Sequence, residues 1–107
     1  MKKIKTYISG PMTGIPRKVY LQKFDRAAKA INSCNNLKAV NPARGIGVWI
    51  YYILGRKIAL LYDLWLLSHC DRIYMLFDWE ESQGAKLEKA FAEANNIEIK
   101  YQMFIHN

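Results

Sequence analysis

The chain has 107 residues, 51% of them hydrophobic, which suffices for one domain with a single core but not for two. Its 16 Lys and Arg against 9 Asp and Glu give a formal charge of +7. This charge favours anionic partners, and the scattered basic residues argue against a dedicated nucleic-acid tail. The two cysteines, Cys34 and Cys70, lack metal-type spacing and are expected to be buried thiols in a reducing compartment.

The first half of the chain predicts two strands joined by a loop and a helix. Residues 3–9 are rich in β-branched and aromatic side chains, as in a strand, and residues 9–16 hold two Gly and two Pro, as in a loop. Residues 19–34 carry apolar side chains at helical spacing. Residues 37–40 form a short strand that Asn41-Pro42 ends.

The second half predicts three helices and two strands. The helices are expected at residues 49–54, 57–69 and 86–95, with a break between the first two near Gly55. Residues 71–77 form a nearly continuous apolar run, which is typical of a strand buried in a parallel sheet. A last strand lies within residues 97–104.

Two segments bear on localisation. The basic N-terminus runs directly into a strand and has no long apolar stretch, so no signal peptide is expected. Residues 48–67 are apolar and long enough to suggest a membrane span. They are interrupted by a glycine and three charged residues, namely Gly55, Arg56, Lys57 and Asp63. We therefore predict a buried helical region in a cytoplasmic protein.

The alternation of strands and helices predicts the fold class. It is α/β, with a Rossmann-like (flavodoxin-like) parallel sheet of four to five strands and helices on both faces, in a single domain over residues 1–107. In such sheets ligands bind at the carboxyl ends of the strands, although the architecture does not define the chemistry.

The segment after the third predicted strand, residues 79–88, is the most informative part of the chain. It places Glu88 in the first turn of a predicted helix, and Gly84 allows the backbone to approach a ligand. An acid in a first helical turn is commonly structural, because the helix terminus stabilises its charge. The same effect would keep Glu88 ionised. Asp63, on an otherwise apolar helix, needs a partner if it is buried, and either a salt bridge or catalysis would explain it.

Four motifs follow one another along the chain. They are Tyr7-Ile8-Ser9-Gly10-Pro11-Met12-Thr13-Gly14, Asn41-Pro42, Cys70-Asp71-Arg72-Ile73-Tyr74-Met75-Leu76 and Trp79-Glu80-x-Ser82-x-Gly84-Ala85-x-x-Glu88. In order and spacing they resemble the nucleoside 2-deoxyribosyltransferase superfamily, most closely its small bacterial and phage branch of unknown function. The resemblance spans nearly the whole chain.

The resemblance implies three catalytic residues. In that superfamily a glutamate in a Ser-x-Gly-x-x-x-Glu pattern attacks the anomeric carbon, and the pattern maps this role to Glu88. An aspartate in the preceding helix, implied to help protonate the leaving base, maps to Asp63. A first-strand tyrosine, whose hydroxyl would orient the nucleophile, maps to Tyr7, which could equally be sheet packing. Two carboxylates with separate roles are the general solution to glycosidic cleavage.

The resemblance also implies a substrate-binding set. Nucleotide-specific members hold a 5′-phosphate with the first loop and a serine before the nucleophile, and Ser9, Gly10, Thr13 and Ser82 occupy comparable places. Arg17 and Lys18 could add charge, but the first loop itself contains no arginine, which leaves the need for a phosphate open. The other residues of this set are Asn41, Trp79 and Gly84. Asn41 could instead only end a strand, and Trp79 could close the core.

The leading hypothesis is cleavage of the N-glycosidic bond of a (deoxy)nucleoside or nucleoside 5′-monophosphate, by hydrolysis or base exchange, without a cofactor or metal. The alternatives are a non-catalytic nucleotide-binding module and a phage-type accessory protein, although the scattered charges disfavour nucleic acid. Relatives in the superfamily are commonly dimers or larger. The aromatic density from Trp49 to Trp65 likewise favours a homodimer or higher homo-oligomer.

Overall fold

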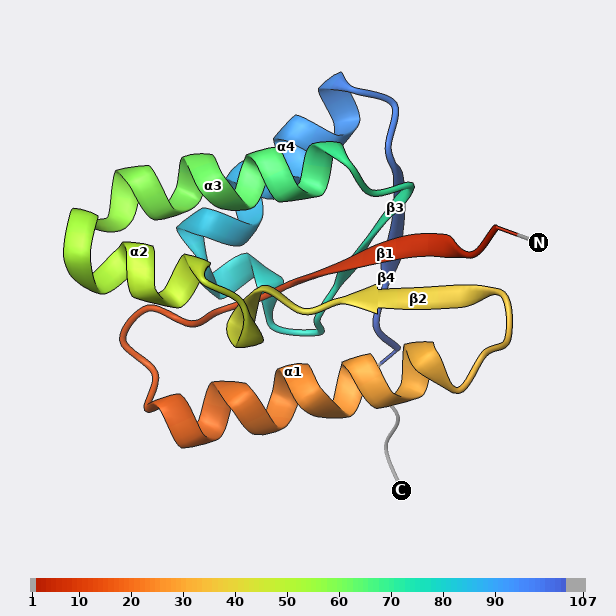
Figure 1. Cartoon of the computed structure of the whole chain (residues 1–107), viewed down its shortest axis with the longest axis horizontal. Coiled ribbons are helices and arrows are strands. Elements are labelled where there is room, and N and C mark those ends of the chain that lie inside the picture. The colour runs from red at the N-terminus through yellow and green to blue at the C-terminus, as the bar shows by residue number, and fades with distance from the viewer. Residues whose placement is uncertain (1, 104–107) are drawn as a thin grey trace.

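The protein is described by a computed structural model over residues 2–103, and it has the predicted α/β fold with a parallel sheet (Figure 1). The strands lie in the order β2-β1-β3-β4, with every neighbouring pair parallel. The strands are β1 (Ile4–Ser9), β2 (Leu37–Val40), β3 (Arg72–Met75) and β4 (Glu98–Tyr101). The helices are α1 (Arg17–Asn32), α2 (Gly47–Leu54), α3 (Arg56–Ser68) and α4 (Gln83–Ala94), with short 3₁₀ turns at Pro42–Arg44 and Trp79–Glu81.

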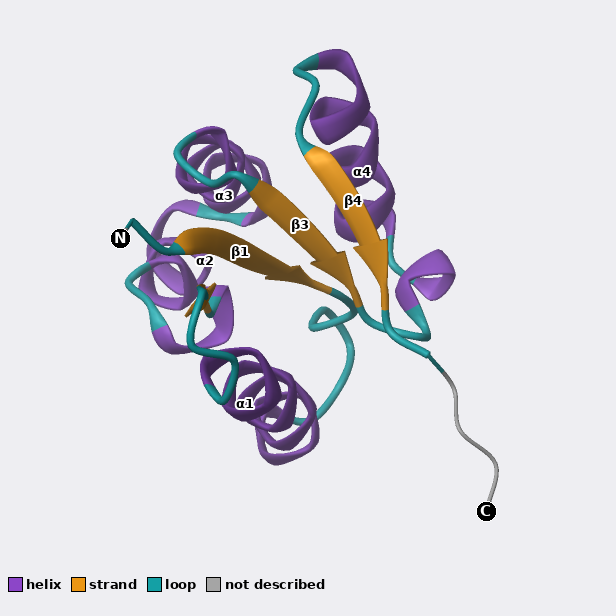
Figure 2. Cartoon of the chain, turned by 90° about the vertical axis from the view of Figure 1, so that its right-hand side faces the viewer, coloured by secondary structure: helices purple, strands orange, loops and turns teal. Residues whose placement is uncertain are grey.

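Helices cover both faces of the sheet, as predicted (Figure 2). On one face α1 packs Phe24 and Ile31 against Ile8 of β1. On the other face α3 and α4 pack against Tyr7 and Ile73. Because side chains alternate along a strand, Tyr7 and Ser9 share the face of α3 and α4, while Ile8 faces α1. Each face of the central strand β1 therefore has its own buried cluster.

The position at which open α/β sheets usually bind ligands lies here between β1 and β3. Chain order reverses between these neighbours, since β1 connects outward to β2 and β3 continues to β4 on the other side. The connections leaving the two strands therefore diverge and leave a crevice, the usual ligand position in open α/β sheets.

Several predicted boundaries shift. Helix α4 begins at Gln83 rather than residue 86, because the Ser82 side chain caps it by accepting a hydrogen bond from the Ala85 N–H. The strand predicted at 71–77 is limited to Arg72–Met75, and the Phe77 N–H instead donates to the Gln102 side chain. The last strand occupies Glu98–Tyr101, and residue 104 lies outside the described residues.

Residues 48–67, predicted to be a buried helical region, are helical but largely exposed. The break falls at Gly55, whose φ of 95° favours glycine. The prediction of burial is wrong, because α2 packs mainly on α3 and leaves its outer side uncovered; Trp49 is 70% and Leu61 61% exposed. Cys34 is likewise exposed, whereas Cys70 is buried as expected. No helix within residues 2–103 combines the length and apolarity that crossing a membrane requires.

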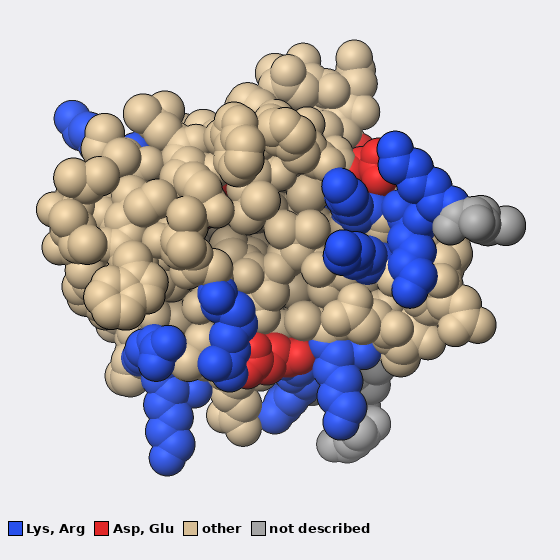
Figure 3. All heavy atoms as spheres, in the orientation of Figure 1, with Lys and Arg blue, Asp and Glu red and all other residues tan. Residues whose placement is uncertain are grey.

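Charge is unevenly placed on the face shown in Figure 3. Lys and Arg side chains gather along α1 and near the N-terminal end of the sheet. The part formed by α2 and α3 shows few charges, which matches its exposed apolar side chains, and we call this surface the α2–α3 face. Its large exposed residues are Trp49, Tyr52, Ile53, Leu54, Ile58, Leu61 and Trp65.

Candidate functional site

A buried carboxylate lies at the centre of the site. Glu88 of α4 is only 6% exposed, and each of its oxygens accepts one hydrogen bond from β1. The Tyr7 hydroxyl donates to Oε2 at 2.5 Å, and the Ser9 hydroxyl donates to Oε1 at 2.6 Å. The alternation of β1 places both hydroxyls on the same side of the sheet, so one strand holds both ends of the carboxylate. The resemblance alone had linked only Tyr7 to this glutamate.

The environment of Glu88 differs from the one predicted. Since α4 starts at Gln83, Glu88 is its sixth residue and lies beyond the first turn, where a helix terminus acts on charge. Burial raises the pKa of Glu88 to about 7, against the hydrogen bonds from Ser9 and Tyr7, which lower it. The expectation that the helix start keeps Glu88 ionised is therefore wrong. Burial and the adjacent Glu88 charge also raise the pKa of Tyr7 well above its ordinary value, so Tyr7 remains a hydrogen-bond donor.

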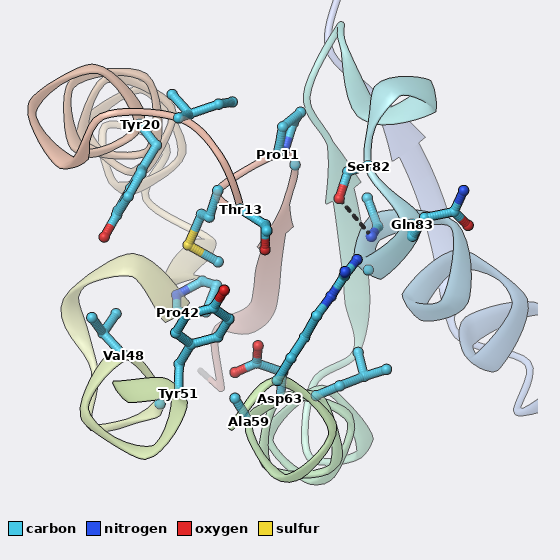
Figure 4. Close-up of a pocket in the computed structure, with 18 of the residues that line it drawn as sticks. Pro11, Thr13, Tyr20, Pro42, Val48, Tyr51, Ala59, Asp63, Ser82 and Gln83 are labelled. Atoms are coloured by element: carbon cyan, nitrogen blue, oxygen red, sulfur yellow. Dashed lines mark hydrogen bonds between the residues drawn. The ribbon is translucent and has the colours of Figure 1, made fainter. Parts of the chain in front are cut away.

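A second carboxyl faces the same cavity. Asp63 of α3 points toward its centre in Figure 4, and within residues 2–103 no group donates a hydrogen bond to it. Burial, followed by the charge of Glu88, raises the pKa of Asp63 to about 7. Glu88 lines the same cavity, so its charge acts on Asp63 within one space. The fold thus brings Tyr7, Asp63 and Glu88 together from β1, α3 and α4.

The cavity has a volume of about 490 Å³ and opens at the carboxyl ends of β1 and β3. Ligand pockets of small molecules fall in this size range. The loop after β1 and the start of α4 form opposite walls, and α2 and α3 form the floor in Figure 4. Labelled lining residues in that view include Thr13, Tyr20, Tyr51, Asp63 and Ser82.

Four of the predicted substrate-binding residues line this cavity, namely Gly10, Thr13, Ser82 and Gly84. Gly10 has a packing reason as well, since a Cβ there would lie 2.6 Å from Leu76 Cδ1. Gly84 has ordinary space around it, with the nearest atom 3.8 Å from an added Cβ. The Ser82 oxygen accepts the helix-capping hydrogen bond, and its own proton is left for another acceptor.

Three other predicted residues do not line the cavity. Ser9 lies behind Glu88, to which it donates. The Asn41 side chain accepts from the Ala43 N–H and donates to Asp25, so it caps the 3₁₀ turn after β2. Trp79 packs against the core between Tyr101 and Lys89. Of the readings weighed for Asn41 and Trp79, their contacts favour the structural one.

Further lining residues were not identified from the sequence. They include Met12, Gly47, Tyr51 and Arg56. The last three belong to α2 and α3, whose sequences are largely apolar. Arg17 lines the cavity, as its proximity to the first loop suggested, whereas Lys18 does not. Among residues 2–103, no group of three His, Cys, Asp or Glu side chains is arranged to hold a metal ion.

Comparison with known families gives one match that covers most of the chain. The family described as a domain of unknown function, DUF4406, matches residues 4–101, from the start of β1 to the end of β4. The matched region therefore contains the whole sheet and all three residues of the buried site. No curated protein matches the chain.

Proposed function

The chain belongs to the DUF4406 family, and from the arrangement of Tyr7, Asp63 and Glu88 we propose that it cleaves the N-glycosidic bond of a (deoxy)nucleoside or nucleoside 5′-monophosphate. The observation that carries the proposal is one buried carboxylate held by two hydroxyls, with a second, unbonded carboxyl facing the same cavity. Glycosidic cleavage needs two carboxyl groups in different protonation states.

The hydrogen bonds support different protonation states for the two carboxyl groups. Both oxygens of Glu88 accept from hydroxyl groups, and such bonds favour the ionised form. Asp63 receives no hydrogen bond and lies near the Glu88 charge, which favours its protonated form. Burial raises the pKa of both acids to about 7, and their contacts support placing the proton on Asp63 and the charge on Glu88.

In the proposed reaction the Glu88 carboxylate attacks C1′ of the sugar and forms an ester as the C1′–N bond breaks. The bonding electrons pass to the departing base, and Asp63 supplies the proton that neutralises it. Water or a second base then attacks C1′ and gives its proton to the Asp63 carboxylate, while the C1′–O bond to Glu88 breaks and releases Glu88 as a carboxylate. Tyr7 and Ser9 hold the carboxylate plane fixed throughout, so little reorganisation is required.

The test is direct. The protein is incubated with a panel of nucleosides and nucleoside 5′-monophosphates, with and without an acceptor base, and free base is followed by chromatography. Release without acceptor indicates hydrolysis, and exchange only with acceptor indicates transfer. If folded protein releases and exchanges no base, the catalytic proposal is wrong. Nucleotide binding without turnover would instead support the non-catalytic module.

Two arginines support the monophosphate as the preferred substrate. Arg17 at the start of α1 and Arg56 at the start of α3 both line the cavity. Neither belongs to any of the ion pairs among the described residues, whereas Lys23, Arg44, Arg72 and Lys89 are all paired with carboxylates. Free guanidinium groups at a cavity suit a phosphate, which they can bind through two hydrogen bonds.

Replacing Arg56 by methionine is expected to lower kcat/KM for a nucleoside 5′-monophosphate by about tenfold to a hundredfold. A loss of this size is expected because the variant lacks a charge-assisted hydrogen bond to the phosphate. The same change should leave kcat/KM for the matching nucleoside within about twofold of the wild-type value, since that substrate has no phosphate. Steady-state kinetics on both substrates measures this difference. Lys57→Met, one residue along the helix and outside the cavity lining, is the matched control. Equal losses on both substrates would contradict the assignment.

We also propose that the protein is a homodimer joined through the α2–α3 face. That face exposes Trp49 (70%), Leu61 (61%) and Trp65 (57%), and apolar patches of this kind mark interfaces. A second copy would present the same uncharged surface and make a self-complementary contact.

Light scattering after size exclusion should give about twice the 12.5 kDa chain mass, and Leu61→Asp should give a monomer. Val19→Asp, at an exposed apolar residue of α1, should stay dimeric. A monomeric wild type would refute this assembly.

A further inference from the structure

A glycine lies against the carboxyl that we assign as the acid. Gly47 is the first residue of α2 and is buried. A Cβ at this position would lie 3.0 Å from Asp63 Oδ1 and 3.1 Å from the Tyr62 ring. Protein side chains rarely contact one another so closely. The Asp63 carboxyl can therefore occupy its observed position because residue 47 has no side chain.

The conformation of Gly47 does not by itself call for glycine. The positive-φ glycines of the described chain are Gly14 and Gly55, and Gly47 is not among them. Gly47 also lines the cavity. A glycine is therefore needed here for the room it leaves beside Asp63 and not for a backbone conformation. Gly45, two residues earlier, offers a contrast, since a Cβ there meets nothing closer than the Pro42 carbonyl at 3.9 Å.

We infer that Gly47 is a positioning residue, which sets where the Asp63 carboxyl stands relative to the leaving base. The acid role of Asp63 in this inference rests on the proposed function. The position of Asp63 rests on the contact between α2 and α3. A methyl group at position 47 must push Asp63, Tyr62 or both by a few tenths of an ångström. Asp63 borders an open cavity, and so it is the freer of the two to move.

The step affected is proton delivery. When the C1′–N bond breaks, the Asp63 proton must reach the base nitrogen that receives the bonding electrons. The attack of Glu88 on C1′ does not involve Gly47, because Tyr7 and Ser9 hold that carboxylate from β1. Displacing Asp63 therefore slows cleavage of bases that must be protonated and spares a leaving group that departs as a stable anion.

The charged groups near Asp63 come from several elements. The charge of Glu88 on α4 acts on Asp63, and Asp63 in turn acts on Tyr7 of β1. Arg17, Arg56 and Glu81 line the same space. The three atoms nearest to a Cβ at position 47 belong to Asp63 and Tyr62, and to none of these groups. A change in the pH profile of Gly47→Ala would consequently report on Asp63.

The experiment compares wild type, Gly47→Ala and Gly45→Ala on two substrates. One is the best natural nucleoside or nucleotide, and the other carries p-nitrophenol in place of the base. Gly47→Ala is expected to lower kcat on the natural substrate by about tenfold, since small misplacements of a reacting group cost on this scale. It should leave kcat for the p-nitrophenyl substrate within about twofold and should move the alkaline limb of the pH profile. Gly45→Ala should match the wild type throughout.

Equal kcat values and superimposable pH profiles for Gly47→Ala and wild type on the natural substrate would overturn the inference. So would an equal loss on both substrates, which would indicate general damage to the fold. A second measurement does not depend on turnover. Carboxyl carbon NMR titration of Asp63 should give a different midpoint in Gly47→Ala and an unchanged one in Gly45→Ala. If wild type releases no base at all, the proposed function fails, while the titration still decides whether Gly47 positions Asp63.

Discussion

Glutamine in place of Glu88 is expected to reduce base release on the order of 10³-fold or more, because a neutral amide can neither attack C1′ nor stabilise positive charge on the sugar. Glutamine keeps the shape of the side chain, so the contacts with Tyr7 and Ser9 should persist and the fold should be retained. Chromatography of free base, with circular dichroism of each variant, measures both.

Glu93→Gln provides the control for this substitution. Glu93 lies on the same helix, is exposed and pairs only with Lys89, so its replacement should leave activity unchanged. If Glu88→Gln kept wild-type turnover, Glu88 would not be the nucleophile. If both variants lost activity equally, the loss would reflect α4 as a whole and not the buried carboxylate.

The same carboxylate should make the protein less stable as the pH rises. The folded state holds the pKa of Glu88 at about 7, against an ordinary value of 4.5. Between these values the folded state binds more protons than the unfolded state, and the free energy of unfolding therefore falls as pH increases. For Glu88 the decrease is on the order of 3 kcal/mol, complete slightly above pH 7. Asp63 acts in the same direction, with a smaller effect because it is partly exposed.

Urea denaturation at intervals from pH 4.5 to pH 8 measures this dependence. Glu88→Gln should remove most of the slope and be more stable than wild type above pH 7, where the wild type must bury a charge. The variant would then lose activity and gain stability in one substitution, which is a common relation at functional sites. Parallel curves for wild type and variant would show that the ionisation of Glu88 is not coupled to folding.

The fold could be predicted because its signals are local. The strand at Leu37–Val40 has the predicted bounds, since Asn41-Pro42 ends it. The break at Gly55 was also predicted, since only a positive φ separates the two helices there. The start of α4 was missed because it depends on a cap in which the Ser82 hydroxyl accepts a hydrogen bond from the Ala85 N–H. Serine side chains also make other local hydrogen bonds, so the sequence does not show that this serine caps a helix.

The site was only partly predictable. Tyr7, Asp63 and Glu88 emerged from the motif resemblance, and parallel topology explains why distant segments meet at one edge. The pairing of Ser9 with Glu88 follows from strand alternation once the strand is known, but the sequence does not show which helix covers that face. Arg56 and Gly47 were missed because their roles depend on how α2 and α3 pack on each other and at the edge of the sheet, which the sequence alone does not show.

The two hydroxyls on β1 have a consequence for how the sheet assembles. Tyr7 and Ser9 are separated by one residue, so a slip of β1 by one position would turn both away from α4 together. Ile8 would then face Glu88, and the buried carboxylate would lose both donors and stand against hydrocarbon. The correct alignment alone satisfies the acid. We therefore expect Glu88, which is proposed as the nucleophile, also to destabilise misaligned pairings of β1 during folding.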